Sequence, residues 1–306
     1  MFTIGYNTNG LAHHRLLDGL RLLSDLGYEG VAITPDVGAL DPLQLDPGLV
    51  ADTRSWASDL GLALSIETGA RFVLDARRKH YPTLLEDDPA ARARRVEFLK
   101  SSVDLAVALD AHVVSLWSGS APDGCLADEA GDRPGAEAGR ASRAACWERL
   151  CSGITQVLEY AGERGIQIAF EPEPGMFIER PEGYGELLER LGSAGDTLGL
   201  CLDVGHLLVT GDLPVEGVIQ TWAPRLVHVH LDDIADGIHE HRMFGTGELD
   251  LPATLNALIK VGYDGMCAVE LSRDSHRGAA AAEEAMGHIR AALAGLGAPP
   301  KGLAEG

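Results

Sequence analysis

The chain has 306 residues, 45% of them apolar, with 46 acidic side chains against 25 lysines and arginines and a formal net charge of −21. This length suffices for a large core in one domain of repeated strand–helix units. The negative charge is opposite to the one that nucleic acids and anionic membrane surfaces attract, so we expect neither partner.

The termini and cysteines indicate a cytoplasmic protein. The first residues contain no basic leader followed by a long apolar segment, and no segment approaches the roughly 18 apolar residues of a membrane span. The five cysteines are odd in number and form no CxxC pair, which favours a reducing compartment over a disulfide scaffold.

Short apolar segments alternate with amphipathic ones from end to end. The predicted strands are Phe2–Tyr6, Gly30–Thr34, Ala63–Glu67, His112–Trp117, Ile166–Glu171, Thr197–Asp203, Leu226–Leu231 and Met266–Leu271. The predicted helices span residues 13–27, 47–60, 90–109, 139–164, 182–192, 214–222, 251–261 and 277–295. Eight alternating units predict a parallel sheet, and eight is the number that closes a (β/α)8 TIM barrel.

A doubly wound open sheet is the alternative fold, but GYNTNGLAHH after the first strand has no GxGxxG phosphate loop. We predict a single α/β domain, a barrel over residues 1–295, and a flexible tail over residues 296–306. Long loops at 68–89 and 118–138 follow the third and fourth strands and are typical of lids or disordered segments.

Ligand-type side chains mark the ends of the last four strands. The fifth strand stops at Glu171, the sixth at Asp203 and the eighth at Glu270. The seventh places His228 and His230 on one face, because they are two residues apart. Active sites of this barrel lie at the carboxyl ends of the strands, so we expect these groups to meet at one rim.

Three carboxylates and an imidazole at one rim would repel one another without a cation. A divalent ion turns them into a mixed oxygen and nitrogen site that suits Mn²⁺, Mg²⁺, Co²⁺ or Zn²⁺. The predicted ligands of one such ion are Glu171, Asp203, His230 and Glu270. The alternative for any one carboxylate is that it caps the next helix or is solvated.

These segments resemble the xylose isomerase-like TIM barrels, which include sugar isomerases, ketose 3-epimerases, hydroxypyruvate isomerase, inosose dehydratase and, more distantly, endonuclease IV. The resemblance is most specific over residues 166–271, in FEPEPG, CLDVGH, VHVHLDD, GTGELD and VEL. It implies the same four metal ligands and a substrate contact for His206. The segment HEHRMFGTGELD (239–250) resembles the loop that closes over the site in this family.

The resemblance to endonuclease IV is incomplete. That enzyme carries extra histidines at the ends of its third and fourth strands, where this chain has Glu67 and Trp117. His239 and His241 match the spacing of an additional Asp/His pair in that enzyme, so a second metal ion is left open. Without the other histidines, and at a charge of −21, DNA cleavage is not expected.

The chemistry expected of such a site is proton transfer. Glu171 and Glu270 belong to the fifth and eighth strands, so they can flank a substrate bound to the ion. An ion that chelates a carbonyl and its neighbouring hydroxyl acidifies the C–H between them and stabilises the enediolate. With one carboxylate removing the proton and the other returning it, we expect an isomerase or epimerase of a sugar, sugar acid or polyol ketone.

Further residues are candidates for substrate contact. Trp117 offers an apolar wall for a sugar ring or is a core residue, Arg242 lies beside the GTG turn, and Glu173 is the second acid of FEPEPG. His206 contacts a substrate oxygen or caps the following helix. His228 supports the site or is a satisfied core histidine, and we favour the core histidine.

Basic residues cluster in ARFVLDARRKHYPTLL (70–85), a loop of a very acidic protein. We predict that this loop reaches over the rim and that Arg77 and Arg78 bind an anionic group of the substrate. The alternatives are a basic surface turn and a contact between subunits of a homo-oligomer.

Two other functions use the same scaffold. A dehydratase or lyase of the inosose type would remove the same proton and expel water. A non-catalytic binding or pathway-accessory barrel would keep the ligand set without turnover.

Overall fold

The structure, a computed structural model, describes residues 2–36, 38–69, 71–122 and 142–297. Residues 123–138 of the second predicted loop and residues 298–306 of the predicted tail lie outside these ranges.

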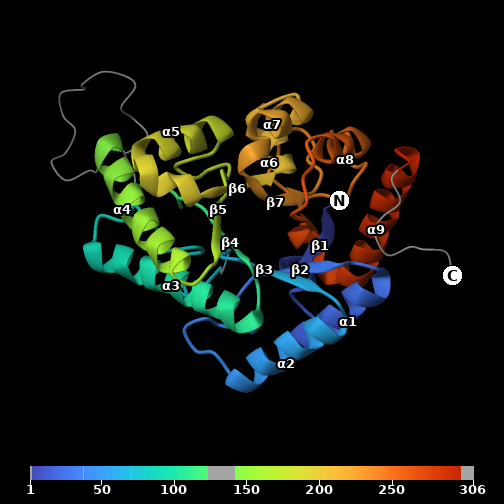
Figure 1. Cartoon of the computed structure of the whole chain (residues 1–306), viewed down its shortest axis with the longest axis horizontal. Helices are drawn as coiled ribbons and strands as arrows, with labels where there is room; N and C mark the ends of the chain where they lie inside the picture. The colour runs from blue at the N-terminus through green and yellow to red at the C-terminus, as the bar shows by residue number, and fades with distance from the viewer. Residues whose placement is uncertain (1, 37, 70, 123–141, 298–306) are drawn as a thin grey trace.

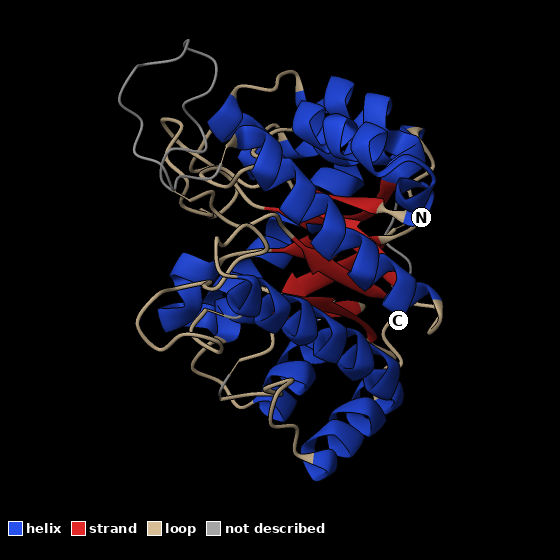
Figure 2. Cartoon of the chain, turned by 90° about the vertical axis from the view of Figure 1, so that its left-hand side faces the viewer, coloured by secondary structure: helices blue, strands red, loops and turns tan. Residues whose placement is uncertain are grey.

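Eight parallel strands form a closed barrel with helices around it, which confirms the predicted TIM barrel (Figures 1 and 2). The strands are β1 (Thr3–Asn7), β2 (Gly30–Ile33), β3 (Ala63–Glu67), β4 (Val113–Leu116), β5 (Gln167–Phe170), β6 (Gly199–Asp203), β7 (Leu226–Leu231) and β8 (Met266–Val269). Each strand pairs with the next, and β8 pairs with β1 to close the barrel. Consecutive strands therefore present their carboxyl ends to one rim.

The helices follow the predicted order. The long ones are α1 (Leu16–Leu26), α2 (Pro47–Asp59), α3 (Pro89–Leu109), α4 (Arg143–Gly162), α5 (Pro181–Leu191), α7 (Val215–Trp222), α8 (Leu251–Lys260) and α9 (Gly278–Gly295). The sequence prediction missed α6 (Val204–Thr210), which begins directly after β6 without a loop between them. Four short 3₁₀ helices, η1 (Thr8–Leu11), η2 (Gly192–Thr197), η3 (Ala223–Arg225) and η4 (Ser272–Arg277), fill connections.

Several helices begin at an aspartate with a proline one or two residues after it. Asp46 and Asp88 accept backbone N–H groups of the first turns of α2 and α3, and Asp250 does the same for α8. These carboxylates satisfy amides that have no partner within the helix and lie at the positive end of its dipole. Part of the acidic excess of the chain is therefore structural.

The amino-terminal part of the barrel interior is filled by Met266. A Cβ atom on Gly5 would lie 2.7 Å from its sulfur, and one on Gly30 would lie 2.6 Å from its terminal methyl group. The small residues Ala32 and Ala268 pack beside the same side chain. Because this part of the barrel is filled, the polar groups of the interior gather toward the carboxyl rim.

Many of the described loops, drawn in tan, gather at one end of the barrel (Figure 2). In the described part of the chain, none of the helices combines the length and apolarity needed to span a bilayer. Cys201 and Cys267 are buried free thiols, whereas Cys146 is disulfide-bonded, a bond that the sequence analysis did not predict.

Candidate metal and substrate site

The ends of β5 to β8 bring together the four side chains that the sequence singled out. Glu171 and Glu270 follow the last residues of β5 and β8, Asp203 ends β6, and His230 lies in β7. One ligand atom from each of these four residues lies within 4.8 Å of the others. The closed sheet produces this convergence, because the four strands are hydrogen-bonded neighbours.

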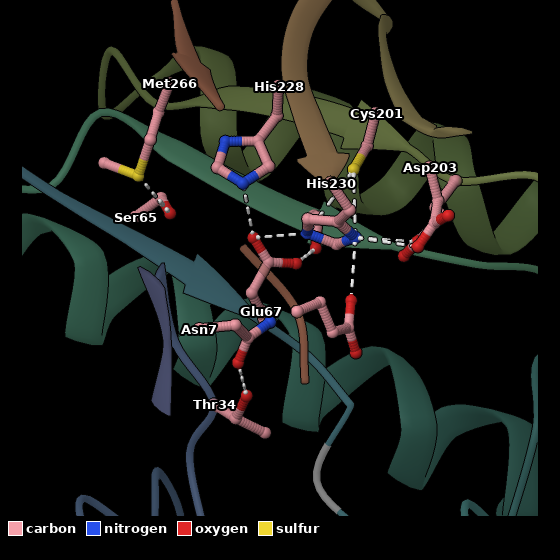
Figure 3. A network of polar contacts seen from close by, with 12 residues as sticks. Asn7, Thr34, Ser65, Glu67, Cys201, Asp203, His228, His230 and Met266 are labelled. Carbon is pink, nitrogen blue, oxygen red and sulfur yellow. Dashed lines mark hydrogen bonds and ion pairs between the residues drawn. The ribbon is translucent and has the colours of Figure 1, made fainter. Parts of the chain in front are cut away.

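His230 lies at the centre of this group (Figure 3). Its Nδ1 atom is 3.0 Å from Glu171 Oε1 and 3.1 Å from Glu270 Oε2. Burial alone would lower the pKa of His230, but the thiol of Cys201 and the surrounding carboxylates raise it well above its ordinary value. The group is therefore an acidic cluster that favours a positive charge at its centre.

Asp203 has one oxygen engaged and one without a hydrogen bond. Its Oδ1 accepts the backbone N–H of His206 at 2.9 Å and so caps α6. Its buried Oδ2 has no hydrogen-bond partner, and nitrogens of His206, His230 and His241 surround it at 3.6 to 3.9 Å. A buried carboxylate oxygen among imidazoles, too distant to receive their hydrogen bonds, fits a metal ligand.

Glu67, at the end of β3, supports His230 from the other side. Its Oε1 lies 3.3 Å from His230 Nε2 and 3.0 Å from His228 Nε2, while Ser115 donates its hydroxyl to Oε2 (Figure 3). Burial would raise the pKa of Glu67, but His230 and His228 hold it well below its usual range. A carboxylate on the second nitrogen of an imidazole fixes which nitrogen faces a metal.

The sequence analysis noted Glu67 only as a strand end without a histidine and assigned it no role. The feature of the sequence that could have identified Glu67 is its place at the end of the third strand, at the same rim as the other acids. His228 is fully buried beside Glu67, so it belongs to the interior layer beneath His230 and is not exposed to the cavity.

A second cluster of histidines lies beside the first. Ligand atoms of His206, His239 and His241 lie within 4.8 Å of one another, and so do those of Asp203, Asp232 and His241. His241 Nδ1 is 2.7 Å from Asp232 Oδ2, and the acids Glu270 and Asp232 outweigh burial and raise the pKa of His241 to about 10. Burial and His206 lower the pKa of His239 to about 3.

Asp233 fixes the loop that carries His239 and His241. Its fully buried carboxylate accepts backbone N–H groups at 2.8 to 2.9 Å from four residues, Ile234, Gly245, Gly247 and Leu249. A Cβ atom on Gly247 would lie 2.2 Å from a backbone oxygen, so the second glycine of GTGELD permits this close wrapping. The turn therefore folds around Asp233, and its glycines do not line the site cavity.

A cavity of about 100 Å³ opens at the rim above these clusters. Its walls contain Asn7, Asn9, Thr34, Glu67, Gly69, Arg71, Lys79, His80, Trp117, Glu171, Glu173, His206, His230, His241, Glu270 and Ser272. Both predicted catalytic residues and three of the six predicted substrate residues are in this set, while Asn7, Asn9 and Ser272 were not anticipated. The two asparagines come from the end of β1 and the 3₁₀ helix after it.

Three predicted substrate residues do not line the cavity. Arg242 forms an ion pair with Glu240 at 3.0 Å. Arg77 and Arg78 are exposed, and Arg78 forms an ion pair at 3.1 Å with Asp75, whose carboxylate also accepts both arginine backbone N–H groups. This local turn directs the pair away from the rim.

His206, Glu173 and Trp117 complete the cavity wall. His206 Nδ1 lies 3.1 Å from the carbonyl oxygen of Pro172, and its Nε2 has no hydrogen-bond partner. Burial and the neighbouring Glu171 raise the pKa of Glu173 to about 8. Trp117 is 6% exposed and meets the ring of His80 edge-on at 5.2 Å, so it is both a wall and a core residue.

The fold and this rim define a TIM barrel with converging acids and histidines, and the comparison with known families agrees. The family model for the xylose isomerase-like TIM barrel matches residues 20–292. The chain belongs to this family.

Two curated relatives match part of the chain. Rhizopine catabolism protein MocC of Rhizobium meliloti is 29% identical over 159 residues, which cover 46% of this chain and 48% of that protein. Inosose dehydratase of Lacticaseibacillus casei is 28% identical over 145 residues, which cover 42% and 48%. The matched region thus spans about half the length of these relatives.

Solved structures resemble the whole chain. An L-ribulose 3-epimerase, 22% identical, has a TM-score of 0.72 and covers 96% of this chain and 95% of its own. A D-allulose 3-epimerase from Methylomonas sp., in complex with D-allulose, is 18% identical with a TM-score of 0.70 and coverage of 95% and 96%. At these identities the likeness shows the fold.

Proposed function

We propose that this protein is a divalent-metal-dependent isomerase or epimerase of a sugar, sugar acid or polyol ketone. The observation that carries the proposal is the convergence of three carboxylates and one imidazole on a buried rim, within 4.8 Å of one another. Glu171, His230 and Glu270 line a cavity large enough for only a small molecule. The likeness to sugar epimerases and to inosose dehydratase supports the same class of substrate.

The proposed ligands of the ion are Glu171, Asp203, His230 and Glu270. The unpartnered oxygen of Asp203 and the acidic surroundings of His230 fit a cation of the Mn²⁺, Mg²⁺, Co²⁺ or Zn²⁺ type. When bound, such an ion would polarise a substrate carbonyl and lower the free energy of the developing negative charge.

Glu171 and Glu270 are the proposed proton-transfer groups. They extend from β5 and β8, with two strands between them, and one carboxylate oxygen of each approaches His230 Nδ1. Two carboxylates from separate strands can serve one carbon from different directions, removing a proton and returning one. Return to the same carbon inverts it, and return to the adjacent carbon moves the carbonyl group.

The other cavity residues would orient the substrate. The free Nε2 of His206 can bind a substrate oxygen, because Nδ1 already faces the Pro172 carbonyl group. Trp117 offers an apolar face beside it, and Glu173 lies in the same wall. Together these groups place hydrogen-bonding and apolar surfaces around one small ligand.

His239 and His241 form a proposed second metal site, which His206 would complete. A three-imidazole site suits Zn²⁺ or Co²⁺ better than Mg²⁺. Metal analysis of the purified protein tests the second site: one equivalent of metal per chain indicates a single ion, and two equivalents indicate that both sites are occupied.

Inosose-type dehydration is the second candidate function. It is favoured by the similarity to inosose dehydratase, and it begins with the same removal of a proton next to a carbonyl group. It differs in that water leaves, so the product lacks a hydroxyl group.

Deuterium uptake tests both reactions. The Mn²⁺-loaded protein is incubated in D₂O with candidate ketoses and inososes, and deuterium incorporation and water loss are followed by NMR and mass spectrometry. We expect Glu171→Gln and Glu270→Gln to slow uptake by about 10²- to 10⁴-fold, the usual contribution of a general acid or base.

The matched control is Glu163→Gln, since Glu163 is 77% exposed and lies outside the cavity. Uptake in this variant should equal that of the unchanged protein. A Mn²⁺-loaded protein that binds these ketoses but exchanges no proton would identify a binding barrel and contradict the proposed reaction.

A further inference from the structure

Two cations in the cavity wall have no acidic partner. Arg71 and Lys79 line the cavity, and in the described part of the chain neither side chain forms an ion pair or hydrogen bond. By contrast, Arg78 in the same loop pairs with Asp75. Cations left unpaired in a chain with a net charge of −21 point to a ligand that brings the missing charge.

The loop geometry places these two cations on the inner side. The backbone N–H of His80 donates to the carbonyl oxygen of Arg71 at 2.7 Å, so the two ends of the loop are held together. Arg71, which is half-buried, and Lys79, which is exposed, line the cavity, whereas Phe72, Arg77 and Arg78 are exposed and do not line it.

The electrostatic surroundings of Lys79 contain charges of both signs. Burial and the charge of Arg71 lower the pKa of Lys79 and outweigh Glu173 and Glu270, which act in the opposite direction, so the two cations are close enough to repel each other. Arg95 lies behind the wall, 3% exposed, with its guanidinium 5.5 Å from the Trp117 ring and no acidic partner among the described residues. An anionic group beside Arg71 and Lys79 would relieve this repulsion.

Charges of both signs line the same cavity. Glu171 and Glu270 are in its wall, and so are Arg71 and Lys79. Arg71 also lines a neighbouring cavity, together with Asn9 and Thr34. A ligand with an anionic end would place that end against the two cations.

We propose that Arg71 and Lys79 bind a carboxylate or phosphate group of the substrate, at the end remote from the carbonyl and hydroxyl pair. The assignment of the two ends rests on the proposed function, whereas the preference for an anion rests on the cations alone. The substrate class becomes a keto sugar acid or a keto sugar phosphate.

Three ketoses with one carbon skeleton test this assignment: neutral D-fructose, its 6-carboxylate D-fructuronate and its 6-phosphate. Binding is measured by calorimetry with EDTA-treated protein and again with Mn²⁺. We expect at least one anionic ketose to bind about tenfold or more tightly than D-fructose under both conditions, and salt to reduce this preference. The two anionic ketoses distinguish a carboxylate from a phosphate.

Arg71→Gln and Lys79→Gln, alone and combined, should reduce the preference, and the double variant should retain less than about twofold. The matched control, Arg77→Gln combined with Arg78→Gln, removes two charges from the same loop and should keep the full preference. Unfolding midpoints report whether each variant is folded. If the Arg71 variant does not fold, the Lys79→Gln variant alone tests the proposal, because Lys79 is exposed.

Equal binding of the three ketoses, no binding of either anionic one, or a preference that survives in the folded Gln variants would overturn the proposal. These outcomes are separate from the proposed reaction, because the preference is measured without metal. An anion preference without deuterium uptake would keep this subsite and contradict only the proposed reaction.

Discussion

The two halves of the barrel rim differ in chemistry. Strands β5 to β8 end at or next to acids and an imidazole, and these side chains converge within 4.8 Å. Strands β1 and β2 are followed by amides and a hydroxyl group, and β4 is followed by Trp117. One half of the rim thus concentrates charge, while the other shapes the cavity.

The half of the rim formed by β1 to β4 nevertheless supports the half formed by β5 to β8. Asn9, after β1, donates a hydrogen bond of 2.7 Å to Glu270 Oε1. Glu67, the acid of β3, contacts His230 from below. The acids and the imidazole on neighbouring strands are therefore oriented both from the adjoining strand β1 and, across the closed barrel, from β3.

Asp203→Asn breaks the acidic half and should have the largest effect. The amide oxygen can still accept the N–H of His206, so the cap of α6 is kept while the charge that we propose to bind the metal is lost. We expect Mn²⁺ affinity to fall by more than about 100-fold, since a side chain that contacts the ion matters at least as much as one that only orients such a side chain. Calorimetry with EDTA-treated protein measures the affinity.

Asp104→Asn is the control for this variant, because Asp104 lies on α3 with a side chain that is 52% exposed and paired with Arg164. Its Mn²⁺ affinity should be unchanged. An Asp203 variant that binds Mn²⁺ as tightly as the unchanged protein would rule out Asp203 as a ligand.

Glu67→Gln tests the support that crosses the barrel. Gln has the same shape without the charge that holds His230 and His228, so we expect Mn²⁺ affinity to fall by about 10- to 100-fold. Ser115→Ala removes only the hydroxyl bonded to the other oxygen and should cost less. If Ser115→Ala lowers Mn²⁺ affinity more than Glu67→Gln does, the charge of Glu67 is not what orients His230.

His80→Asn tests a residue of the other half of the rim through the pH dependence of stability. His80 has a φ of +67°, a backbone conformation that Asn also tolerates. Burial and Lys79 lower its pKa to about 3, so in the folded protein it stays neutral where an unfolded histidine, with a pKa near 6.5, gains a proton. Its contribution to stability is therefore complete above pH 6.5 and declines as the pH falls toward 3.

Between pH 7 and 5.5 the free energy of unfolding should fall about 1 kcal/mol more steeply in the unchanged protein than in His80→Asn. Urea unfolding of both EDTA-treated proteins at each pH measures the difference, and titration of all other groups cancels in the comparison. Parallel pH profiles would show that His80 is not held neutral by burial.

The sequence predicted the barrel because its strands are buried on both faces and read as continuous apolar segments. β2, β6 and β8 are buried at every position, so their ends were visible as the first polar residue. The same reasoning found Glu171, Asp203 and Glu270. It missed α6, because Asp203 ends a strand and caps a helix at once, leaving no loop signal.

The loop contacts were harder to predict. In the segment 70–85, the inner and outer cations differ only in their place on a loop closed by one backbone hydrogen bond, between His80 and Arg71. No hydrophobic periodicity marks such a contact. The sequence analysis therefore selected Arg77 and Arg78, whereas the residues of this loop that line the cavity include Arg71 and Lys79. Glu67 was missed for another reason: its role comes from its contact with His230 across the barrel, which the sequence does not reveal.

The clamp around Asp233 has a consequence for changing the specificity of this protein. Four backbone amides on one carboxylate tie the loop with His239 and His241 to β7, so alterations in GTGELD would disturb both histidines together. The loop of Arg71 and Lys79 is joined at its base by a single backbone bond between Arg71 and His80. Libraries aimed at new substrates should therefore vary residues 71–80 and leave 233–249 intact.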